Sequence, residues 1–305
     1  MNFEQIEQYL NDTSSPVQLV KHYDDVKKKP AFPLKVQIKY DGVYCLGIRI
    51  GEEVRYYSRT GKRLFLNQHP PYLRSVTDGV YIGELVNPTL SLEQLSGLVN
   101  PNRKADWTLE EQAQMTASKV YWHDALTFEE FLAGYTAVEY INRHARLDET
   151  RDHVIACTSV FNEEELKEYF NWVVANEYEG VVIKDPHGDW KAGRRDGNAM
   201  KLVREVLVDL ECIGVKWGKG KRENQVAALE FSITNTSTFF ADFGEGWTDA
   251  RRDALTQEYL TDPMTVLGRI WEVRGLQPSS TGEAIRLPKV LRVRDDKEVQ
   301  DVVRD

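Results

Sequence analysis

The chain has 305 residues, of which 41% are hydrophobic and 29% are charged, and this length suffices for one large or two ordinary globular domains. No apolar run approaches the roughly 20 residues needed to cross a membrane, and residues 1–10 lack the basic and apolar segments of a signal peptide. The three cysteines, Cys45, Cys157 and Cys212, are widely separated, which predicts core packing rather than a disulfide framework or a zinc site. We therefore expect a cytoplasmic protein that has no membrane partner.

The net charge at pH 7 is −9, and the sequence pI is about 5.3. A nucleic-acid-binding protein usually carries a basic surface, so the bulk charge does not favour such a partner. It does not exclude one either, because only the phosphates that are contacted release counterions. Any nucleic-acid binding is therefore expected to be weak and steeply dependent on salt.

Two short amphipathic helices are expected at the start of the chain, one over residues 3–10 and one beginning at Pro16, a residue suited to a first helical position. Residues 35–86 follow with alternating apolar segments between Asp-Gly, Gly-Glu-Glu and Thr-Asp-Gly turns, a pattern typical of strands. Helices then alternate with strands. Their predicted positions are a helix capped by Ser91, a periodic segment over residues 128–141, and a helix that begins with a capping box of Asn162 and Glu165.

The pattern changes after residue 204 to short strands, interrupted by a single helix that begins near Thr248. Five such strands in about 100 residues predict a small Greek-key barrel of the OB type. The basic segment 218–222 lies between the first two of these strands and is expected to be a solvated turn.

The segment Lys39-Tyr40-Asp41-Gly42 ends an alternating apolar stretch that begins at Lys35. A lysine at the end of a strand can present an amine nucleophile to a phosphate, provided that the amine is uncharged when it attacks. The glycine allows the backbone to turn closely past a ligand. On its own, this tetrapeptide supports only a hypothesis.

Four more polar clusters follow or end apolar runs further along the chain: Ser58-Arg59-Thr60-Gly61-Lys62, Gly83-Glu84-Leu85, the segment from Glu179 to Lys184, and the segment from Arg292 to Lys297. In this order and spacing, the series resembles the covalent nucleotidyltransferase superfamily, and most closely the small two-domain ATP-dependent DNA ligases of bacteriophage type. The resemblance implies an α+β fold. An adenylation (nucleotidyltransferase) domain, with ATP-grasp-like mixed antiparallel sheets and helices, is expected over residues 1–204, followed by an OB-fold β-barrel over residues 205–305.

The resemblance also implies a reaction. Lys39 attacks the α-phosphorus of ATP and carries AMP, which passes to the 5′-phosphate of a nick in double-stranded DNA before the neighbouring 3′-hydroxyl displaces it. The family pattern places Mg²⁺ at Glu84 and Glu179, because carboxylate oxygens suit that ion, and gives Asp41 the task of positioning the lysine and a metal-bound water. The simpler alternative for each glutamate is a salt bridge to a neighbouring lysine. The protein is expected to act as a monomer.

By the same resemblance, His123 occupies the position of an aromatic residue that stacks on adenine. The alternative is a structural one, in which Tyr121 and Trp122 lie in the core and His123 is hydrogen-bonded. Gln37 and Ile38 precede the nucleophile on its strand and are expected to bind the nucleotide, Gln37 at the edge of the adenine.

Lys184 and Lys201 are the expected phosphate-binding lysines. The sequence departs from the family pattern at two positions that concern phosphate contact. Relatives usually have Lys-x-Lys where this chain has only Lys201 and, displaced by one position, Arg204. Relatives also have an arginine where this chain has Tyr44, so contact with the nick 5′-phosphate through that position is in doubt. Arg59 is the remaining candidate for phosphate contact, because arginine can bind phosphate through two hydrogen bonds.

Arg294 and Lys297 resemble the last family motif and are expected to bind the nucleotide phosphates. They follow Lys39 by more than 250 residues, so we expect the second domain to close over the first about a hinge at residues 203–208. Three alternatives remain open from the sequence: an mRNA capping guanylyltransferase, an RNA ligase, and a catalytically inactive nucleic-acid-binding module.

Overall fold

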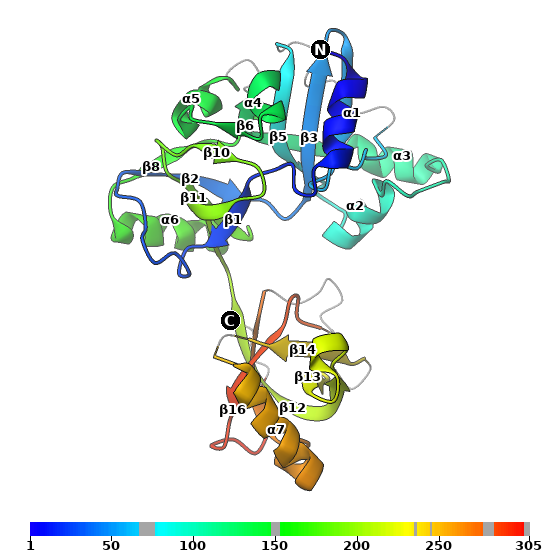
Figure 1. The fold of residues 1–305 in the computed structure, drawn as a ribbon, viewed down its shortest axis with the longest axis vertical. Coiled ribbons are helices and arrows are strands. Elements are labelled where there is room, and N and C mark those ends of the chain that lie inside the picture. The colour runs from blue at the N-terminus through cyan, green and yellow to red at the C-terminus, as the bar shows by residue number, and fades with distance from the viewer. Residues whose placement is uncertain (67–76, 148–152, 235–236, 245, 277–283, 302–305) are drawn as a thin grey trace. The chain divides into compact units, whose positions relative to one another are not determined.

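The computed structural model describes the chain except for residues 67–76, 148–152, 235–236, 245, 277–283 and 302–305. It contains two compact units, Met1–Val203 and Arg204–Asp305 (Figure 1). The predicted α+β fold with a C-terminal five-stranded barrel is confirmed. None of the helices in the described parts of the chain is long and apolar enough to cross a membrane.

The first unit alternates strands and helices along the chain. Its elements are α1 (Phe3–Asp12), β1 (Leu19–His22), β2 (Leu34–Lys39), β3 (Val43–Ile50), β4 (Glu53–Tyr57), β5 (Gly79–Val86), α2 (Leu92–Leu98), α3 (Leu109–Thr116), β6 (Lys119–Leu126), α4 (Phe128–Leu132), β7 (Tyr135–Thr136), α5 (Tyr140–Ala145), β8 (Thr158–Val160), α6 (Glu163–Ala175), β9 (Gly180–Lys184), β10 (Trp190–Lys191) and β11 (Arg195–Val203). The predicted caps Ser91 and Asn162 both accept a backbone hydrogen bond at the start of their helices.

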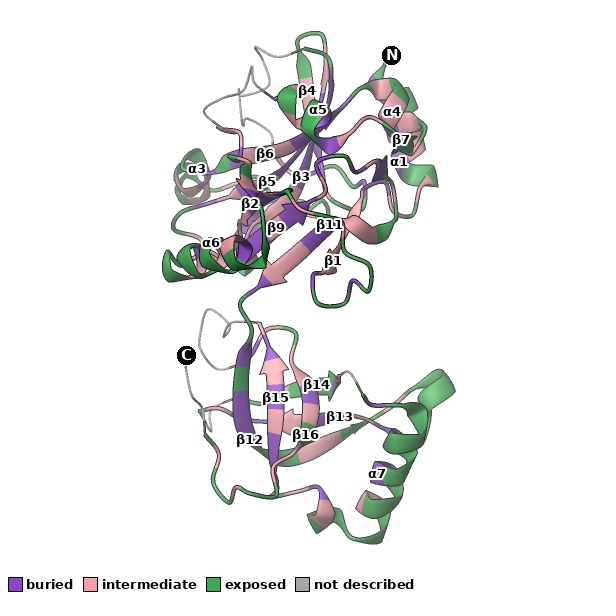
Figure 2. Cartoon of the chain, turned by 90° about the vertical axis from the view of Figure 1, so that its left-hand side faces the viewer, coloured by how far each residue is buried: buried purple, intermediate pink, exposed green. Residues whose placement is uncertain are grey.

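Two sheets organise the first unit. The five-stranded sheet has the order β1-β11-β9-β2-β8, and the four-stranded sheet has the order β4-β3-β5-β6. Helix α6 packs on one face of the five-stranded sheet. The four-stranded sheet is covered on one face by α1 and α4 and on the other by α2 and α3. Buried residues therefore concentrate on the strands, while the outer surface of α6 is exposed (Figure 2).

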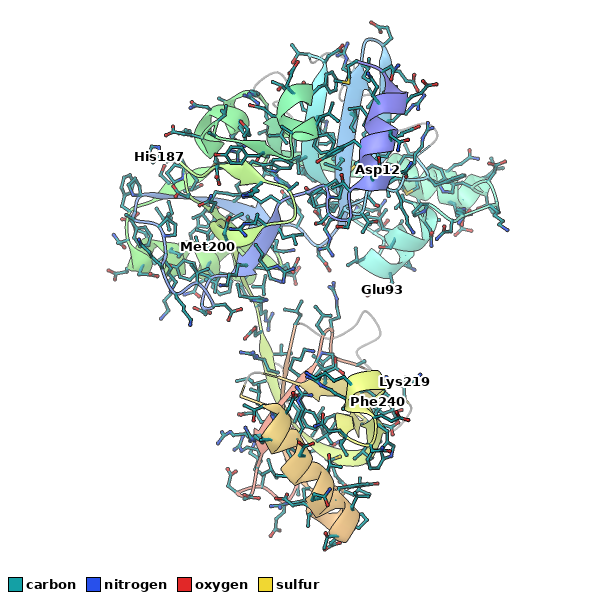
Figure 3. All side chains as sticks on the ribbon, viewed as in Figure 1. Asp12, Glu93, His187, Met200, Lys219 and Phe240 are labelled. Carbon is teal, nitrogen blue, oxygen red and sulfur yellow. The ribbon has the colours of Figure 1, made fainter. Side chains whose placement is uncertain are left out.

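The predicted helix beginning at Pro16 is wrong. Residues Leu19–His22 form strand β1, which pairs in parallel with β11 so that His22 lies opposite Lys201. The hydrogen-bonding partner of this segment lies nearly the whole length of the unit away in sequence, so local periodicity gave no sign of it. Met200, labelled in Figure 3, is buried in the core of the same sheet.

The predicted continuous helix over residues 128–141 is also wrong. Two short helices, α4 and α5, are separated in the chain by β7, which pairs with the distant strand β10. The break falls at Gly134, which has φ of 66°, a left-handed conformation that ends a helix.

The second unit is a closed barrel with one long helix. Its elements are β12 (Val206–Trp217), the 3-10 helix η3 (Gly220–Arg222), β13 (Val226–Phe231), β14 (Phe239–Phe243), α7 (Asp249–Thr261), the 3-10 helix η4 (Pro263–Thr265), β15 (Ile270–Gly275) and β16 (Lys289–Val293). The strands close in the order β12-β13-β14-β16-β15, which leaves no sheet edge unpaired. The C-terminal segment returns to β12, where Asp301 and Asp209 exchange two backbone hydrogen bonds.

Candidate functional site

Lys39 is the last residue of β2 and lies opposite Gly180 of β9 in an antiparallel pairing. This pairing brings its Nζ atom to Glu179, with which it forms an ion pair and to which it donates a hydrogen bond. The Lys39 side chain remains 22% exposed, whereas that of Glu179 is 8% exposed. The amine is therefore both held by a carboxylate and accessible to a ligand.

Glu179 is positioned by the end of α6. The amides of Glu177 and Tyr178 bond back to the carbonyls of Val174 and Val173, which is a Schellman motif that ends the helix. Gly180 follows with φ of 151°, and a Cβ atom there would lie 2.3 Å from a carbonyl oxygen on β11. Only glycine fits at this crossing from helix to strand, which gives a physical reason for the Glu-Gly sequence.

Glu84 comes to the same place from the other sheet. A Cβ atom on Gly42 would lie 2.3 Å from the carbonyl oxygen of Leu85, so this glycine allows the turn after Lys39 to pack directly on β5. Burial raises the pKa of Glu84 to about 7; Lys39 opposes the rise, while Glu179 and Asp41 add to it. The structure thus brings the predicted lysine and all three predicted carboxylates into one cluster.

This cluster has the donor chemistry of a magnesium site but is not a complete metal cage. Within the described residues, no three His, Cys, Asp or Glu side chains are grouped so that they could hold a metal ion by themselves. Mg²⁺ is commonly bound by one or two carboxylates together with phosphate oxygens of a substrate. Glu84 and Glu179 fit that arrangement, because burial and, to a smaller extent, the charge of Glu179 raise the pKa of Glu84, and a divalent cation would offset both effects.

One face of the five-stranded sheet carries four of the predicted nucleotide-binding residues. Gln37 and Lys39 lie two positions apart on β2, and Gln37 shares Val182 as a cross-strand neighbour with Lys201. Lys184, two residues after Val182, faces the same side. The opposite face of the sheet carries the core that packs on α6. Ile38 packs against that core, so its side chain faces away from Gln37 and Lys39.

Gln37 is almost completely buried, at 1% exposure. Its Nε2 atom donates a hydrogen bond of 3.1 Å to the carbonyl oxygen of Ile155 and lies 3.3 Å from the His144 ring. Its Oε1 atom is buried without a partner among the described residues. A fixed amide with an unused acceptor can read a donor on a bound base.

His123 lies at a β-bulge. Ile82 of β5 pairs with Asp124 and Gly83 pairs with Trp122, so His123 has no direct partner in the ladder. Trp122 is fully buried in the core, as the structural alternative expected, but the Nδ1 atom of His123 is buried without a partner in the described part of the chain. Burial, with Lys184 adding to it, lowers the pKa of His123 to about 3. The ring is therefore neutral at physiological pH and available for stacking.

Tyr44 stands where relatives are expected to have an arginine. It lies opposite Glu84, and its ring meets that of His123 edge-on at 6.4 Å. Burial, with Asp124 and Glu84 adding to it, raises the pKa of Tyr44 well above its usual value, while nearby Arg59 opposes the rise. Arg59 itself is exposed, so an exposed cation and a neutral phenol share this side of the site.

Lys184 is buried beside an ion pair that no sequence pattern predicts. Arg143 on α5 donates two hydrogen bonds, of 3.0 and 3.1 Å, to Asp124, and both side chains are 1% exposed. Burial lowers the pKa of Lys184, and Asp124 opposes this effect. The Nζ atom of Lys184 also lies 5.1 Å from the centroid of the Tyr140 ring. Periodicity could not reveal this cluster, because its members come from three separate elements.

Arg294 and Lys297 belong to an ion-pair network within the barrel unit. Arg294 Nη1 contacts both carboxylate oxygens of Asp209, at 3.0 and 2.9 Å, and Lys297 Nζ lies 2.6 Å from Asp209 Oδ2. Arg294 also pairs with Asp296, and Lys297 with Asp301. Both cations are thus neutralised by carboxylates of their own unit, and their expected action on the nucleotide stays a prediction.

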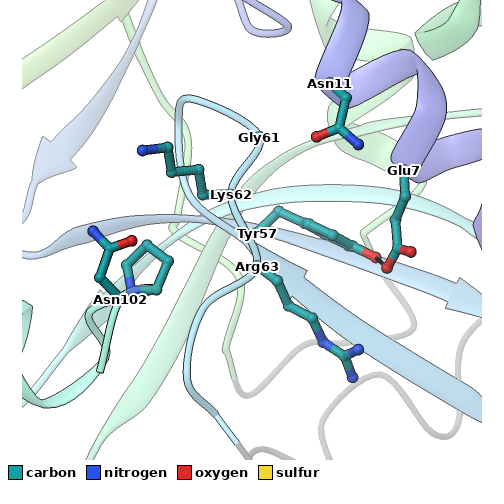
Figure 4. A pocket seen from close by; sticks show the side chains of 8 residues that line it. Glu7, Asn11, Tyr57, Gly61, Lys62, Arg63 and Asn102 are labelled. Atoms are coloured by element: carbon teal, nitrogen blue, oxygen red, sulfur yellow. Dashed lines mark hydrogen bonds between the residues drawn. The ribbon is translucent and has the colours of Figure 1, made fainter. Parts of the chain in front are cut away.

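A polar cavity of about 440 Å³ lies beside the turn that follows β4 (Figure 4). Lys62 and Arg63 contribute two exposed cations to its lining, and Arg63 interacts electrostatically with Glu7. The carboxylate in the lining, Glu7, is already paired with Arg55 at 2.9 Å and accepts a hydrogen bond of 2.8 Å from Tyr57. The lining therefore carries two cations and one carboxylate. The complete lining is Glu7, Asn11, Tyr57, Gly61, Lys62, Arg63, Pro101 and Asn102.

A family model described as "ATP dependent DNA ligase domain" matches residues 17–202. The chain belongs to this ligase family. Two curated relatives are a "DNA ligase" of Methanococcus maripaludis, 23% identical over 93% of this chain and 57% of that protein, and "DNA ligase 1" of Methanosarcina barkeri, 25% identical over 93% of this chain and 62% of that protein. The chain thus spans a little over half the length of these ligases.

Two solved structures share the fold of this ligase-family chain. One, "Pmar-Lig_Pre.", has a TM-score of 0.72 at 21% identity and aligns over 92% of this chain and 68% of that chain. The other, titled "DNA binding with a minimal scaffold: Structure-function analysis of Lig E DNA ligases", has a TM-score of 0.69 at 16% identity and aligns over 91% of this chain and 98% of that chain. The family recognised from the motifs is confirmed, whereas the bacteriophage type stays a prediction.

Proposed function

We propose that the protein is an ATP-dependent DNA ligase that seals 5′-phosphate/3′-hydroxyl nicks in duplex DNA and acts as a monomer. The observation that carries the proposal is the cluster of Lys39, Asp41, Glu84 and Glu179, assembled from both sheets of a chain that belongs to the ATP-dependent DNA ligase family. The accessible amine among carboxylates supplies a nucleophile, and the neighbouring cations supply phosphate contacts.

In the first step, Lys39 Nζ attacks the α-phosphorus of ATP. The nitrogen–phosphorus bond forms, the bond to the pyrophosphate oxygen breaks, and a proton leaves the nitrogen. Glu179 accepts a hydrogen bond from Nζ, and this bond fixes the direction of the lone pair on Nζ. Gln37 and His123 hold the adenine, the first by hydrogen bonding and the second by stacking.

Mg²⁺, when bound at Glu84 and Glu179, supplies positive charge to the phosphate oxygens of the transition state. Asp41, next to Gly42 in the turn, adds a carboxylate that orients the lysine. Lys184, Lys201 and Arg59 provide the remaining positive charge for the phosphates of ATP and DNA.

In the second step, the 5′-phosphate oxygen of the nick attacks the same phosphorus and the Lys39 nitrogen leaves with a proton. In the third, the 3′-hydroxyl attacks the 5′-phosphate and AMP leaves. The cavity with Lys62 and Arg63 supports a contact with a backbone phosphate of the duplex, since both cations are exposed beside it.

Purified protein incubated with α-³²P ATP and Mg²⁺ tests the proposal. We expect a covalent AMP adduct on the wild type and none on Lys39→Ala, and no comparable adduct with α-³²P GTP. A guanylyltransferase would prefer GTP, and an inactive binding module would take up neither label. Sealing of nicked duplex DNA but not nicked RNA excludes an RNA ligase. The proposal fails if Lys39→Ala is labelled as strongly as the wild type.

A further inference from the structure

Three tyrosines form a cluster beside Lys39 that has no assigned role. The ring of Tyr40 stacks on that of Tyr121, with centroids 4.5 Å apart and planes within 3° of parallel. The ring of Tyr178 meets Tyr40 edge-on, at 5.5 Å and 83°. Stacked and edge-to-face contacts are the two preferred geometries of aromatic pairs, so Tyr40 is held from two directions at once. We call Tyr40, Tyr121 and Tyr178 the tyrosine frame.

Each member of the frame is tied to one charged member of the site. Tyr40 follows Lys39 in the chain, and Tyr178 precedes Glu179. Tyr121 lies directly opposite Glu84 in the pairing of β6 with β5. Each tyrosine is therefore a direct neighbour of one charged residue, either along the chain or across a strand pair.

The frame also joins the two sheets. Tyr40 directly follows the last residue of β2 in the five-stranded sheet, and Tyr178 leads into β9 of the same sheet. Tyr121 lies on β6 of the four-stranded sheet. Tyr178 is fixed in turn by the Schellman motif that ends α6, in which its amide bonds to the carbonyl of Val173. One end of the frame is thus anchored to a helix terminus and the other to a strand.

We propose that Tyr40 is a positioning residue whose ring, held between Tyr121 and Tyr178, fixes the Lys39 amine relative to Glu84 and Glu179 for attack on the nucleotide. The inference rests on the proposed function, since it assumes that Lys39 is the nucleophile. Because Tyr40 directly follows Lys39, clamping the Tyr40 ring fixes the backbone from which the Lys39 side chain extends, without contacting the substrate. A misplacement of about 1 Å in a reacting group can cost about 100-fold in rate.

The ring, and not the hydroxyl, carries this role. Burial, with Tyr121 and Tyr178 adding to it, raises the pKa of Tyr40 to about 12, so the phenol stays neutral and contributes a flat surface. Phenylalanine preserves that surface, whereas leucine is apolar but smaller and has no planar ring. The pair Tyr40→Phe and Tyr40→Leu therefore separates the two contributions.

The test measures the single-turnover rate of AMP transfer to Lys39 as a function of ATP concentration. Tyr40→Leu should lower the saturating rate by about 10–100-fold while the ATP concentration at half-saturation changes less than about threefold. Tyr40→Phe should stay within about twofold of the wild type. Tyr121→Leu, which removes only the stacked partner, should lower the same rate, and the double variant Tyr40→Leu/Tyr121→Leu should be no slower than the slower single variant.

Tyr9→Leu is the matched control. Tyr9 on α1 makes an edge-to-face contact with Phe131 on α4, with ring centroids 5.1 Å apart, and neither residue belongs to the cluster around Lys39. It should leave the AMP-transfer rate within about twofold. The inference is overturned if Tyr40→Leu keeps the wild-type saturating rate, if Tyr40→Phe is as slow as Tyr40→Leu, or if the effects of Tyr40→Leu and Tyr121→Leu multiply. Should Tyr40→Leu fail to fold, the rate of Tyr121→Leu decides. Absence of labelling on the wild type would instead reject the proposed function.

Discussion

The two units of this ligase-family chain each contain a cluster of cations and carboxylates, and the two clusters differ in how completely their polar groups are paired. In the first unit, Lys39 faces several carboxylates, and the buried polar atoms Gln37 Oε1 and His123 Nδ1 lack partners among the described residues. In the barrel, Arg294 and Lys297 share Asp209 and have further acidic partners. The first cluster keeps polar groups available for a ligand, whereas the second has neutralised its own charge.

The difference teaches that the same residue types serve two purposes. Unsatisfied buried polar groups lower stability, and folded proteins retain them mainly where a ligand completes them. A network whose polar groups are all paired stabilises its own unit and has fewer free polar groups to bind a ligand. Substitutions in the first cluster should therefore affect activity more than stability, and substitutions in the second should do the reverse.

The largest expected effect is on Glu84. Glu84→Gln removes a carboxylate whose charge is disfavoured by burial and by its acidic neighbours, and we expect AMP transfer to Lys39 to slow by about 10²–10³-fold. The unfolding midpoint should not fall. Glu111→Gln, which weakens an ion pair with Arg103 elsewhere in the same unit, is the control and should leave the rate unchanged. Equal rates for the two variants would contradict the prediction.

The next effect is on the barrel. Asp209→Asn removes the carboxylate shared by Arg294 and Lys297, and it should destabilise the barrel by about 1–3 kcal/mol, because it leaves two half-buried cations with fewer partners. Urea unfolding followed by tryptophan fluorescence measures this change. Asp242→Asn, which breaks an exposed pair with Lys289, should cost less than about 1 kcal/mol. A similar loss in both variants would mean that the Asp209 network is no stronger than an ordinary surface pair.

His123 predicts a pH dependence of stability. Its pKa of about 3 in the folded protein lies below the ordinary value of 6.5, so the unfolded chain binds a proton that the folded protein does not. Stability is unaffected above pH 6.5 and falls as the pH drops below it, by about 1 kcal/mol per pH unit. His123→Phe should remove this contribution, which unfolding curves at pH 7 and pH 5 will detect. The exposed His187, labelled in Figure 3, provides the control His187→Phe, which should keep the wild-type dependence.

The smallest effect concerns the cavity beside the β4 turn. Lys62→Ala should reduce the slope of log K against log salt for nicked-duplex binding by about 1 and weaken binding only a few-fold, because one phosphate contact is lost. AMP transfer should be unchanged. Lys167→Ala on the outer surface of α6 removes the same charge away from the cavity and should leave the slope as it is. Identical slopes for wild type and Lys62→Ala would exclude a phosphate contact there.

Sequence patterns predicted the elements whose structure depends on local signals. The barrel strands follow from alternation, and the helices capped by Ser91 and Asn162 follow from their capping residues. Lys39 at the end of β2, Glu84 within β5 and Glu179 just before β9 could also be singled out, because each polar group interrupts or borders an apolar run.

What the sequence could not reveal depends on partners far apart in the chain. The segment after Pro16 is a strand only because β11 pairs with it. The bulge at His123 cannot be seen from alternation, since it depends on the register of β5 against β6. The buried Arg143–Asp124 pair and the tyrosine frame unite elements that no periodic pattern connects.

The cluster around Lys39 takes its members from two different sheets, with the amine on one and Glu84 on the other. A small sliding of the sheets past each other would break the cluster while every hydrogen-bonded ladder stayed intact. Loss of catalysis on warming should accordingly precede loss of the far-ultraviolet circular dichroism signal. The catalytic rate should therefore respond to warming at a lower temperature than the secondary structure does.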